Sequence, residues 1–137
     1  MKSMKIAIGI TSGKINLKAH AGDNPYFNIY ELYEDGTYKL LKEIENKAPE
    51  EKKHADERKM RGVMELLGDI DVIVGGLMSP NFLNLRDKTK IQPVLSKIED
   101  IDIFLNSLYL KFDYIYGLIK KRKRGEFPKE IPLFKEE

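Results

Sequence analysis

The segment from Lys5 to Ile10 constrains the fold of this chain more than any other. It reads Lys-Ile-Ala-Ile-Gly-Ile, which places three isoleucines on one face of a β-strand and the small residues Ala7 and Gly9 on the other. A strand without a polar face is typical of the interior of an α/β sheet that helices cover on both sides, and small residues let a helix approach closely. We therefore predict a central strand in a sheet with two covered faces.

The rest of the chain predicts four more strands and three helices. Residues 26–33 and 38–44 are rich in aromatic and branched side chains and flank Asp35-Gly36, which favours a hairpin with a type I′ turn. A helix that includes Met60 ends at Gly68 and is followed by a strand at 71–74. Ser79 and Pro80 begin the next helix. A strand at 91–95, whose Pro93 favours the sheet edge, precedes the last helix. Because such strand–helix alternation gives parallel strands through right-handed crossovers, the sheet is expected to be mixed.

The last predicted helix is long for so short a chain. Ser96-Lys97-Ile98-Glu99 fits a capping box, and an apolar stripe continues from Ile101 to Ile119. An unbroken helix to Arg124 would be ~40 Å long, whereas a domain of this length has a radius of gyration of ~14 Å. We therefore expect the helix to bend, or its far half to pack against the tail or another subunit.

Composition excludes several classes of protein. The 137 residues suit a single domain, and none of them is cysteine, which excludes a disulfide framework, a thiol nucleophile and a thiolate zinc site. Lysine and arginine number 24 and aspartate and glutamate 22, a net charge of +2 that gives no overall attraction to nucleic acid. No apolar run is long enough for a membrane span, so a soluble, cytoplasmic protein is expected. No spacing of carboxylates or serines marks a catalytic group, and we expect no enzymatic activity.

The segment 11–25 is the first candidate for a functional site, because loops of this length inside a compact domain are usually functional. His20 could bind a transition metal through a neutral imidazole, and Lys14 and Lys18 would favour an anionic complex. The alternative is a surface-loop histidine with solvated lysines. His54, in a highly charged segment, could join His20 only if the fold brings the two segments together; otherwise it lies on a solvated face.

The segment Gly75-Gly76-Leu77-Met78 is the second candidate. It links the end of a strand to the start of a helix, where backbone N–H groups and the helix dipole favour anions. It fits neither the P-loop spacing nor a dinucleotide-binding fingerprint. The Met78 thioether could contact a soft metal, although methionine more often packs in a core. The pattern therefore favours an anionic ligand without identifying it.

The segment Lys120-Lys121-Arg122-Lys123-Arg124 is a strongly basic cluster. It could contact RNA, DNA or a lipid surface. Cations at the C-terminal end of a helix also complement the helix dipole, and no aromatic platform for bases lies nearby. We therefore favour the structural interpretation and keep a nucleic-acid-binding module that uses residues 120–124 as the alternative function.

Two segments resemble parts of a known family. Residues 20–27 read His-Ala-Gly-Asp-Asn-Pro-Tyr-Phe, and residues 72–81 read Val-Ile-Val-Gly-Gly-Leu-Met-Ser-Pro-Asn. The first resembles the His-Phe-Gly-x-Ala-x-x-Phe segment of dinitrogenase iron–molybdenum cofactor-binding domains, and the second is similar to that family's strand, glycine loop and helix start. Residues 5–10 and Glu45-Asn46 fall where the family has matching elements. The resemblance covers roughly residues 4–110.

The resemblance implies a ribonuclease H-like, three-layer α/β domain with a mixed five-stranded sheet, in the order β-β-β-α-β-α-β-α, and an extended C-terminal helix. The cofactor-binding-like domain would span residues 1–110, and a helical extension and tail would span 111–137. The implied function is that of a non-enzymatic binding or carrier protein for an iron–sulfur or iron–molybdenum cluster, bound transiently, with cluster donor and acceptor proteins as partners. The predicted metal ligands are His20 and His54, and the predicted binding site also includes Lys14, Lys18, Gly22, Gly75, Gly76 and Met78.

A homodimer through the C-terminal helix is a further hypothesis. Its interface would be the apolar side formed by Phe112, Ile115, Tyr116 and Ile119. We expect no membrane partner, and nucleic acid is not the expected partner.

Overall fold

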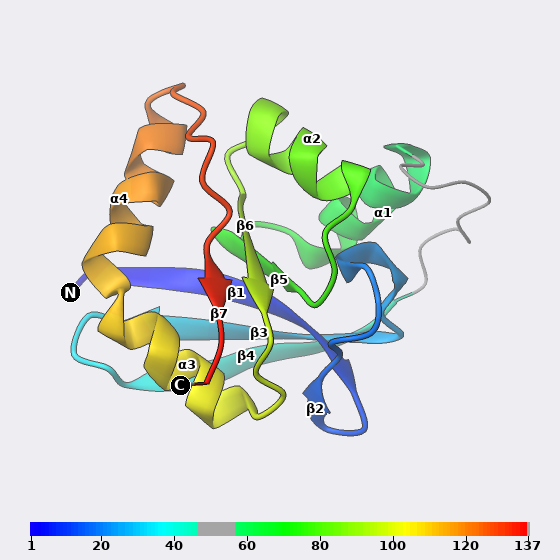
Figure 1. Cartoon of the computed structure of the whole chain (residues 1–137), viewed down its shortest axis with the longest axis horizontal. Coiled ribbons are helices and arrows are strands. Elements are labelled where there is room, and N and C mark those ends of the chain that lie inside the picture. The colour runs from blue at the N-terminus through cyan, green and yellow to red at the C-terminus, as the bar shows by residue number, and fades with distance from the viewer. Residues whose placement is uncertain (47–56, 137) are drawn as a thin grey trace.

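The structure is a computed structural model that describes residues 1–46 and 57–136. It contains one seven-stranded sheet in the order β4-β3-β1-β5-β6-β7, with β2 paired to β1 (Figure 1). The strands are β1 (Ser3–Thr11), β2 (Lys14–Ile15), β3 (Tyr26–Tyr33), β4 (Tyr38–Glu45), β5 (Val72–Gly75), β6 (Gln92–Ser96) and β7 (Leu133–Phe134). The helices are α1 (Glu57–Leu67), α2 (Pro80–Lys88), α3 (Ile101–Leu110), α4 (Phe112–Lys123) and the short 3-10 helix η1 (Ala21–Asp23).

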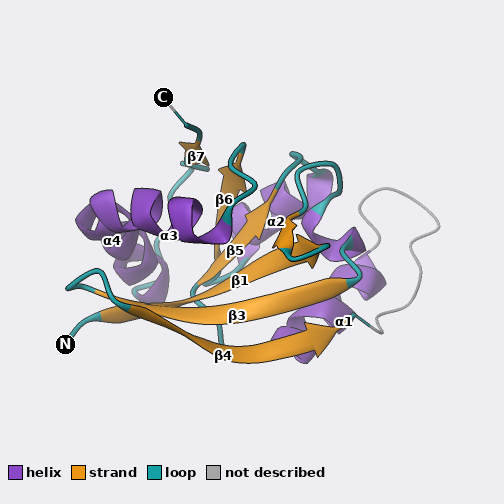
Figure 2. Cartoon of the chain, turned by 90° about the horizontal axis from the view of Figure 1, so that it is seen from below, coloured by secondary structure: helices purple, strands orange, loops and turns teal. Residues whose placement is uncertain are grey.

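Helices cover both faces of this sheet, so the domain has three layers (Figure 1, Figure 2). The isoleucine face of β1 packs in one core with the buried residues of α3 and α4. The opposite face, which carries Ala7, packs in a second core with those of α1 and α2. Both faces of β1 are buried between β3 and β5, which confirms the predicted central strand.

The sheet is mixed, as predicted, but it has seven strands and not five. β1 runs antiparallel to β2 and β3, and β3 runs antiparallel to β4. The pairs β1–β5, β5–β6 and β6–β7 are parallel. The two additional strands, β2 and β7, have only two residues each, and each forms because a longer strand is available beside it.

The hairpin between β3 and β4 is present, but the prediction of its turn type is wrong. Gly36 has a φ of 91°, whereas Asp35 is not among the described residues with positive φ. The Tyr33 N–H donates to the Thr37 carbonyl at 2.8 Å, so the loop is longer than two residues and ends in a single left-handed residue. The type I′ turn lies instead between β1 and β2, where Ser12 and Gly13 both have positive φ.

The predicted long helix is broken, which confirms the expected bend. α3 begins after Asp100, whose side chain accepts a hydrogen bond from the Ile103 N–H at 2.9 Å. The predicted capping box is wrong, because Ser96 ends β6 and its hydroxyl bonds to the backbone of Ile98. Lys111, with φ −113° and ψ 21°, separates α3 from α4.

The strand that contains Pro93 is not at the edge of the sheet. The tail after α4 returns and adds β7 outside β6, so β7 is the edge strand. β7 pairs only with Leu95 and Ser96. The proline is tolerated because no N–H is required of it at that position.

Among the described residues, no helix has both the length and the apolar character that crossing a bilayer requires.

Candidate functional site

The loop from Asn16 to Asn24 packs on the carboxyl ends of β1 and β5. The Asn16 N–H donates to the Gly9 carbonyl at 3.0 Å. A Cβ built on Gly76 would lie 2.4 Å from Leu17 Cα, so the two backbones are in direct contact. The structure therefore brings the loop that carries His20 against the segment that carries Gly75 and Gly76. Glycine is required at Gly76 for this packing, whatever ligand the loop binds.

Two asparagines hold this loop in place. Asn24 is 1% exposed, and its Nδ2 donates to the Ala21 carbonyl at 2.8 Å. Asn46 Nδ2 donates to the carbonyls of Gly22 and Asn24 at 3.0 and 2.8 Å. A Cβ on Gly9 would lie 2.0 Å from Asn24 Nδ2, so this loop also requires the small-residue face of β1. Sequence analysis missed the role of Asn24, since nothing in its local sequence marks it as buried.

The predicted site residues of this loop differ in their exposure. His20 is half-buried and immediately precedes η1, and Gly22 is buried within η1. Lys18 is exposed.

The Met78 side chain is 47% exposed and lies next to Ser79, whose hydroxyl caps α2 by accepting from the Phe82 N–H at 3.2 Å. The predicted N-terminus of α2, with Ser79 as its cap, is confirmed.

Lys14 lies in a different group of charges. It belongs to β2 and lines a pocket of about 470 Å³ together with Lys97, Lys135, Glu99 and Asp100. Because lysines and carboxylates are mixed in this pocket, their charges offset one another. Lys14 can therefore contribute to the predicted anion site only if a ligand bound at His20 also extends to this pocket.

The metal-binding side chains of this site suit a cluster that the protein carries transiently better than a permanently bound metal ion. In residues 1–46 and 57–136, no group of three or more His, Cys, Asp or Glu side chains is placed to hold a metal ion. His54 lies outside the described residues. The described part of the site therefore offers one imidazole, that of His20, which suits a cluster attached at a single point.

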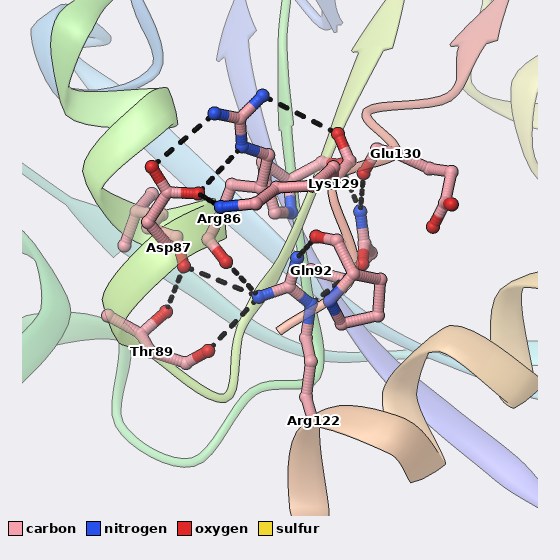
Figure 3. A network of polar contacts seen from close by, with 10 residues as sticks. Arg86, Asp87, Thr89, Gln92, Arg122, Lys129 and Glu130 are labelled. Carbon is pink, nitrogen blue, oxygen red and sulfur yellow. Dashed lines mark hydrogen bonds and ion pairs between the residues drawn. The ribbon is translucent and has the colours of Figure 1, made fainter. Parts of the chain in front are cut away.

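Arg122 is not part of an exposed basic surface, and that part of the sequence prediction is wrong. Its side chain is 0% exposed, and its guanidinium donates to Gln92 Oε1 and the Arg86 carbonyl, both at 2.7 Å (Figure 3). It also donates to the carbonyls of Thr89 and Pro128 at 3.1 and 3.0 Å. Arg122 thus joins the end of α2 and strand β6 to the C-terminal tail, and burial lowers the pKa of its guanidinium.

Helical spacing explains why Arg122 points inward. Ile115, Leu118, Ile119 and Arg122 follow the spacing i, i+3, i+4, i+7, and all four are buried. The guanidinium reaches backbone carbonyls in and just after the last turn of α2, which lack partners within that helix. The helical spacing was therefore the sequence signal that could have predicted that Arg122 is buried while the neighbouring basic residues are not.

The rest of the basic cluster is partly paired. Lys123 Nζ lies 3.4 Å from Asp71 Oδ1, and Arg124 Nε lies 2.9 Å from Glu126 Oε2. Lys120 Nζ lies 5.9 Å from the centre of the Tyr116 ring. With Arg122 buried and two further cations beside carboxylates, the segment presents less positive charge to a nucleic acid than its sequence indicates.

The apolar side of the C-terminal helix is covered by the chain itself. Phe112, Ile115 and Ile119 belong to the same core as β1 and β6. A homodimer through this helix stays a prediction, and it would have to use other side chains.

Comparison with known proteins supports the resemblance seen in the sequence. A model of the family described as dinitrogenase iron-molybdenum cofactor matches residues 4–109, more than half of the chain. No curated protein and no solved structure is significantly similar to the chain. The ribonuclease H-like fold therefore stays a prediction, whereas the three-layer α/β architecture is observed. On the family match, the chain belongs to the dinitrogenase iron-molybdenum cofactor family.

Proposed function

We propose that this protein is a non-enzymatic carrier that binds an anionic iron–sulfur or iron–molybdenum cluster transiently at the loop of residues 16–24. The observation that carries the proposal is the position of His20. It stands in the segment that resembles the family's histidine loop, half-exposed, on a backbone packed against Gly76 at the carboxyl ends of two parallel strands. Ligands of open α/β sheets bind at this kind of edge.

The ligand set supports transient binding. A neutral imidazole is a common ligand of transition metals, and the exposed Lys18 offsets part of a cluster's negative charge. The chain has no cysteine, which is the usual ligand of iron–sulfur clusters. Asp23, in η1, adds a negative charge near His20 and weakens the attraction for an anion. A cluster held in this way passes readily to an acceptor protein, so cluster donor and acceptor proteins are the proposed partners.

The test is iron, molybdenum and acid-labile sulfide analysis of protein purified without oxygen and offered a preformed cluster. We expect the wild type to retain metal and sulfide through gel filtration, and His20→Ala to lose both with an unchanged unfolding transition. His54→Ala is made separately and tests whether His54 contributes a second ligand. Wild type that refuses the cluster, or His20→Ala that retains it, would refute the assignment.

A further inference from the structure

The two glycines of the predicted binding site, Gly75 and Gly76, are covered by the loop of residues 16–24. Both glycines are buried. A Cβ built on Gly76 would lie 2.4 Å from Leu17 Cα and 2.5 Å from the Leu17 carbonyl oxygen. Figure 1 shows the covering segment, in blue between β2 and β3, beside the loop that leads into α2. A ligand bound to His20 therefore has no space to contact these glycines unless the loop moves.

The loop also buries a polar atom that has no hydrogen-bond partner. Asn24 is 1% exposed, and its Nδ2 donates to the carbonyls of Ala21 and His20 at 2.8 and 3.4 Å. The nitrogen is the only donor of a carboxamide, so these bonds fix its orientation. Among the side-chain nitrogens and oxygens that the structure describes, Asn24 Oδ1 is the one buried atom without a partner. An acceptor buried in this way destabilises the closed position of the loop, because water bonds to it when the loop opens.

Few apolar contacts oppose opening of the loop. Ala21 carries the single buried apolar side chain among residues 16–24, and Leu17 is half-buried. The adjoining strand β1, in contrast, has buried residues on both faces. Segments with few buried apolar contacts open locally at a lower free energy than the core does. We therefore expect the loop to open while β1 stays folded.

Both ends of the loop are anchored to the rest of the domain. Before it, the Ile15 N–H donates to the Glu99 carbonyl at 2.9 Å. After it, the Asn46 N–H donates to the Pro25 carbonyl at 2.8 Å. The residues between these anchors can therefore move together and leave the sheet intact.

We propose that the loop of residues 16–24 is a lid that opens as one unit and admits the cluster to Gly75 and Gly76. This inference rests on the proposed function. Opening gives Asn24 Oδ1 access to water and uncovers the carboxyl end of β5, the kind of edge at which ligands of open α/β sheets bind. The bonds that the Asn46 carboxamide donates to two carbonyls of the loop hold the lid closed.

Amide hydrogen exchange of the cluster-free full chain, followed by NMR, tests the opening without any ligand. The reporters are the N–H groups of Asn16 at one end of the loop and of Asp23 near the other, each of which donates to a backbone carbonyl. We expect both to exchange about a hundredfold faster than the N–H groups of Ala7 and Ile8 in β1, at rates that low concentrations of urea do not change. Exchange as slow and as urea-dependent as that of β1 overturns the proposal.

Asn46→Ala removes both carboxamide bonds to the loop, and Asn106→Ala, at an exposed position of α3, is the matched control. A lid that opens as one unit predicts that Asn46→Ala speeds exchange at Asn16 as well as at Asp23, by at least about tenfold. The control should change neither rate. Faster exchange at Asp23 alone, or at neither residue, overturns the proposal. If Asn46→Ala fails to fold, the wild-type exchange rates decide.

Uptake of a preformed iron–sulfur cluster tests the role of the lid in binding. Because opening precedes uptake, Asn46→Ala should take up the cluster faster than the wild type, by a factor similar to that in exchange. An unchanged uptake rate overturns the lid as the route to the site. No uptake by either protein refutes the proposed function and not the opening of the loop, which the exchange rates decide by themselves.

Discussion

Substitution of Arg122 by alanine is expected to destabilise this domain more than any other change in the basic segment 120–124. The buried guanidinium makes four hydrogen bonds of 2.7–3.1 Å, to the Gln92 side chain and to three backbone carbonyls. A buried acceptor left without its donor costs ~1–3 kcal/mol. Four acceptors lose their donor at once, and water that enters the vacated space satisfies part of this loss, so a total of ~3–5 kcal/mol is expected.

That loss is large beside the stability of an ordinary domain, ~5–15 kcal/mol. For a chain of this size, 1 kcal/mol corresponds to ~3–5 °C in Tm, so Arg122→Ala is expected to lower the midpoint by ~10–20 °C. Urea denaturation followed by circular dichroism gives the free energy of unfolding directly. The free energy of unfolding of Arg122→Lys should lie between those of the wild type and Arg122→Ala. Lysine keeps the charge but lacks the planar guanidinium that donates to several acceptors at once.

The matched control is Arg124→Ala, at the same helix end, whose side chain is 58% exposed and pairs with Glu126. Its free energy of unfolding should change by no more than ~0.5 kcal/mol. If Arg122→Ala also changes that energy by less than ~1 kcal/mol, the reasoning from burial and hydrogen bonding is refuted.

Two further predictions concern a close backbone contact and a tyrosine. Gly76→Ala is expected to destabilise the fold by ~1–3 kcal/mol, because its Cβ would lie 2.4 Å from Leu17 Cα; Gly117→Ala, where the helix surface has open space, should instead stabilise it by ~0.5–1 kcal/mol. Equal effects of the two substitutions in urea denaturation would contradict the packing argument. The hydrogen bond that the Tyr38 hydroxyl donates to Asp102, with burial, raises the pKa of Tyr38 to about 12, above its ordinary value of 10.0. The folded state favours the protonated phenol, so this contribution to stability is fully present below pH ~10 and is lost as the pH rises to ~12. Stability measured across this range should fall less steeply in Tyr38→Phe, and identical slopes would show that the phenol is not coupled to folding.

The parts of the fold that the sequence predicts well are those with local signals. The alternation of isoleucine with small residues in 5–10 placed β1 at the centre of the sheet, and Ser79 with Pro80 marked the start of α2. Each of these signals depends on neighbouring residues along the chain. They are therefore available before any tertiary contact forms.

The parts that the sequence does not predict depend on contacts distant in the chain. β7 has two residues and exists because β6 offers it an unpaired edge. The length of the last helix predicts a bend but not its position, because the apolar stripe through Leu108, Phe112 and Ile115 continues across Lys111 and no glycine or proline marks the break. The helix breaks at Lys111 because the core that α3 and α4 cover is shorter than one straight helix of this length.

The candidate site shows the same division. Its residue types were visible in the sequence, but the contact between Leu17 and Gly76 and the bonds from the Asn46 carboxamide to the carbonyls of Gly22 and Asn24 join segments far apart in the chain. These bonds involve backbone carbonyls of the loop and not the His20 imidazole. A substitution of His20 therefore leaves these backbone-holding bonds in place.

This separation decides how the His20 experiment can be interpreted. The two cores and the Arg122 network hold the domain together, and His20 contributes to neither core. A loss of cluster in His20→Ala with an unchanged unfolding transition would therefore report ligation and not folding. A loss of cluster in Gly76→Ala would be ambiguous, because that substitution displaces the loop backbone as well. We expect His20→Ala to be the most stable of the three variants, Gly76→Ala to be intermediate and Arg122→Ala to be the least stable. Cluster binding should not follow that order, because His20→Ala is the variant that lacks the cluster ligand.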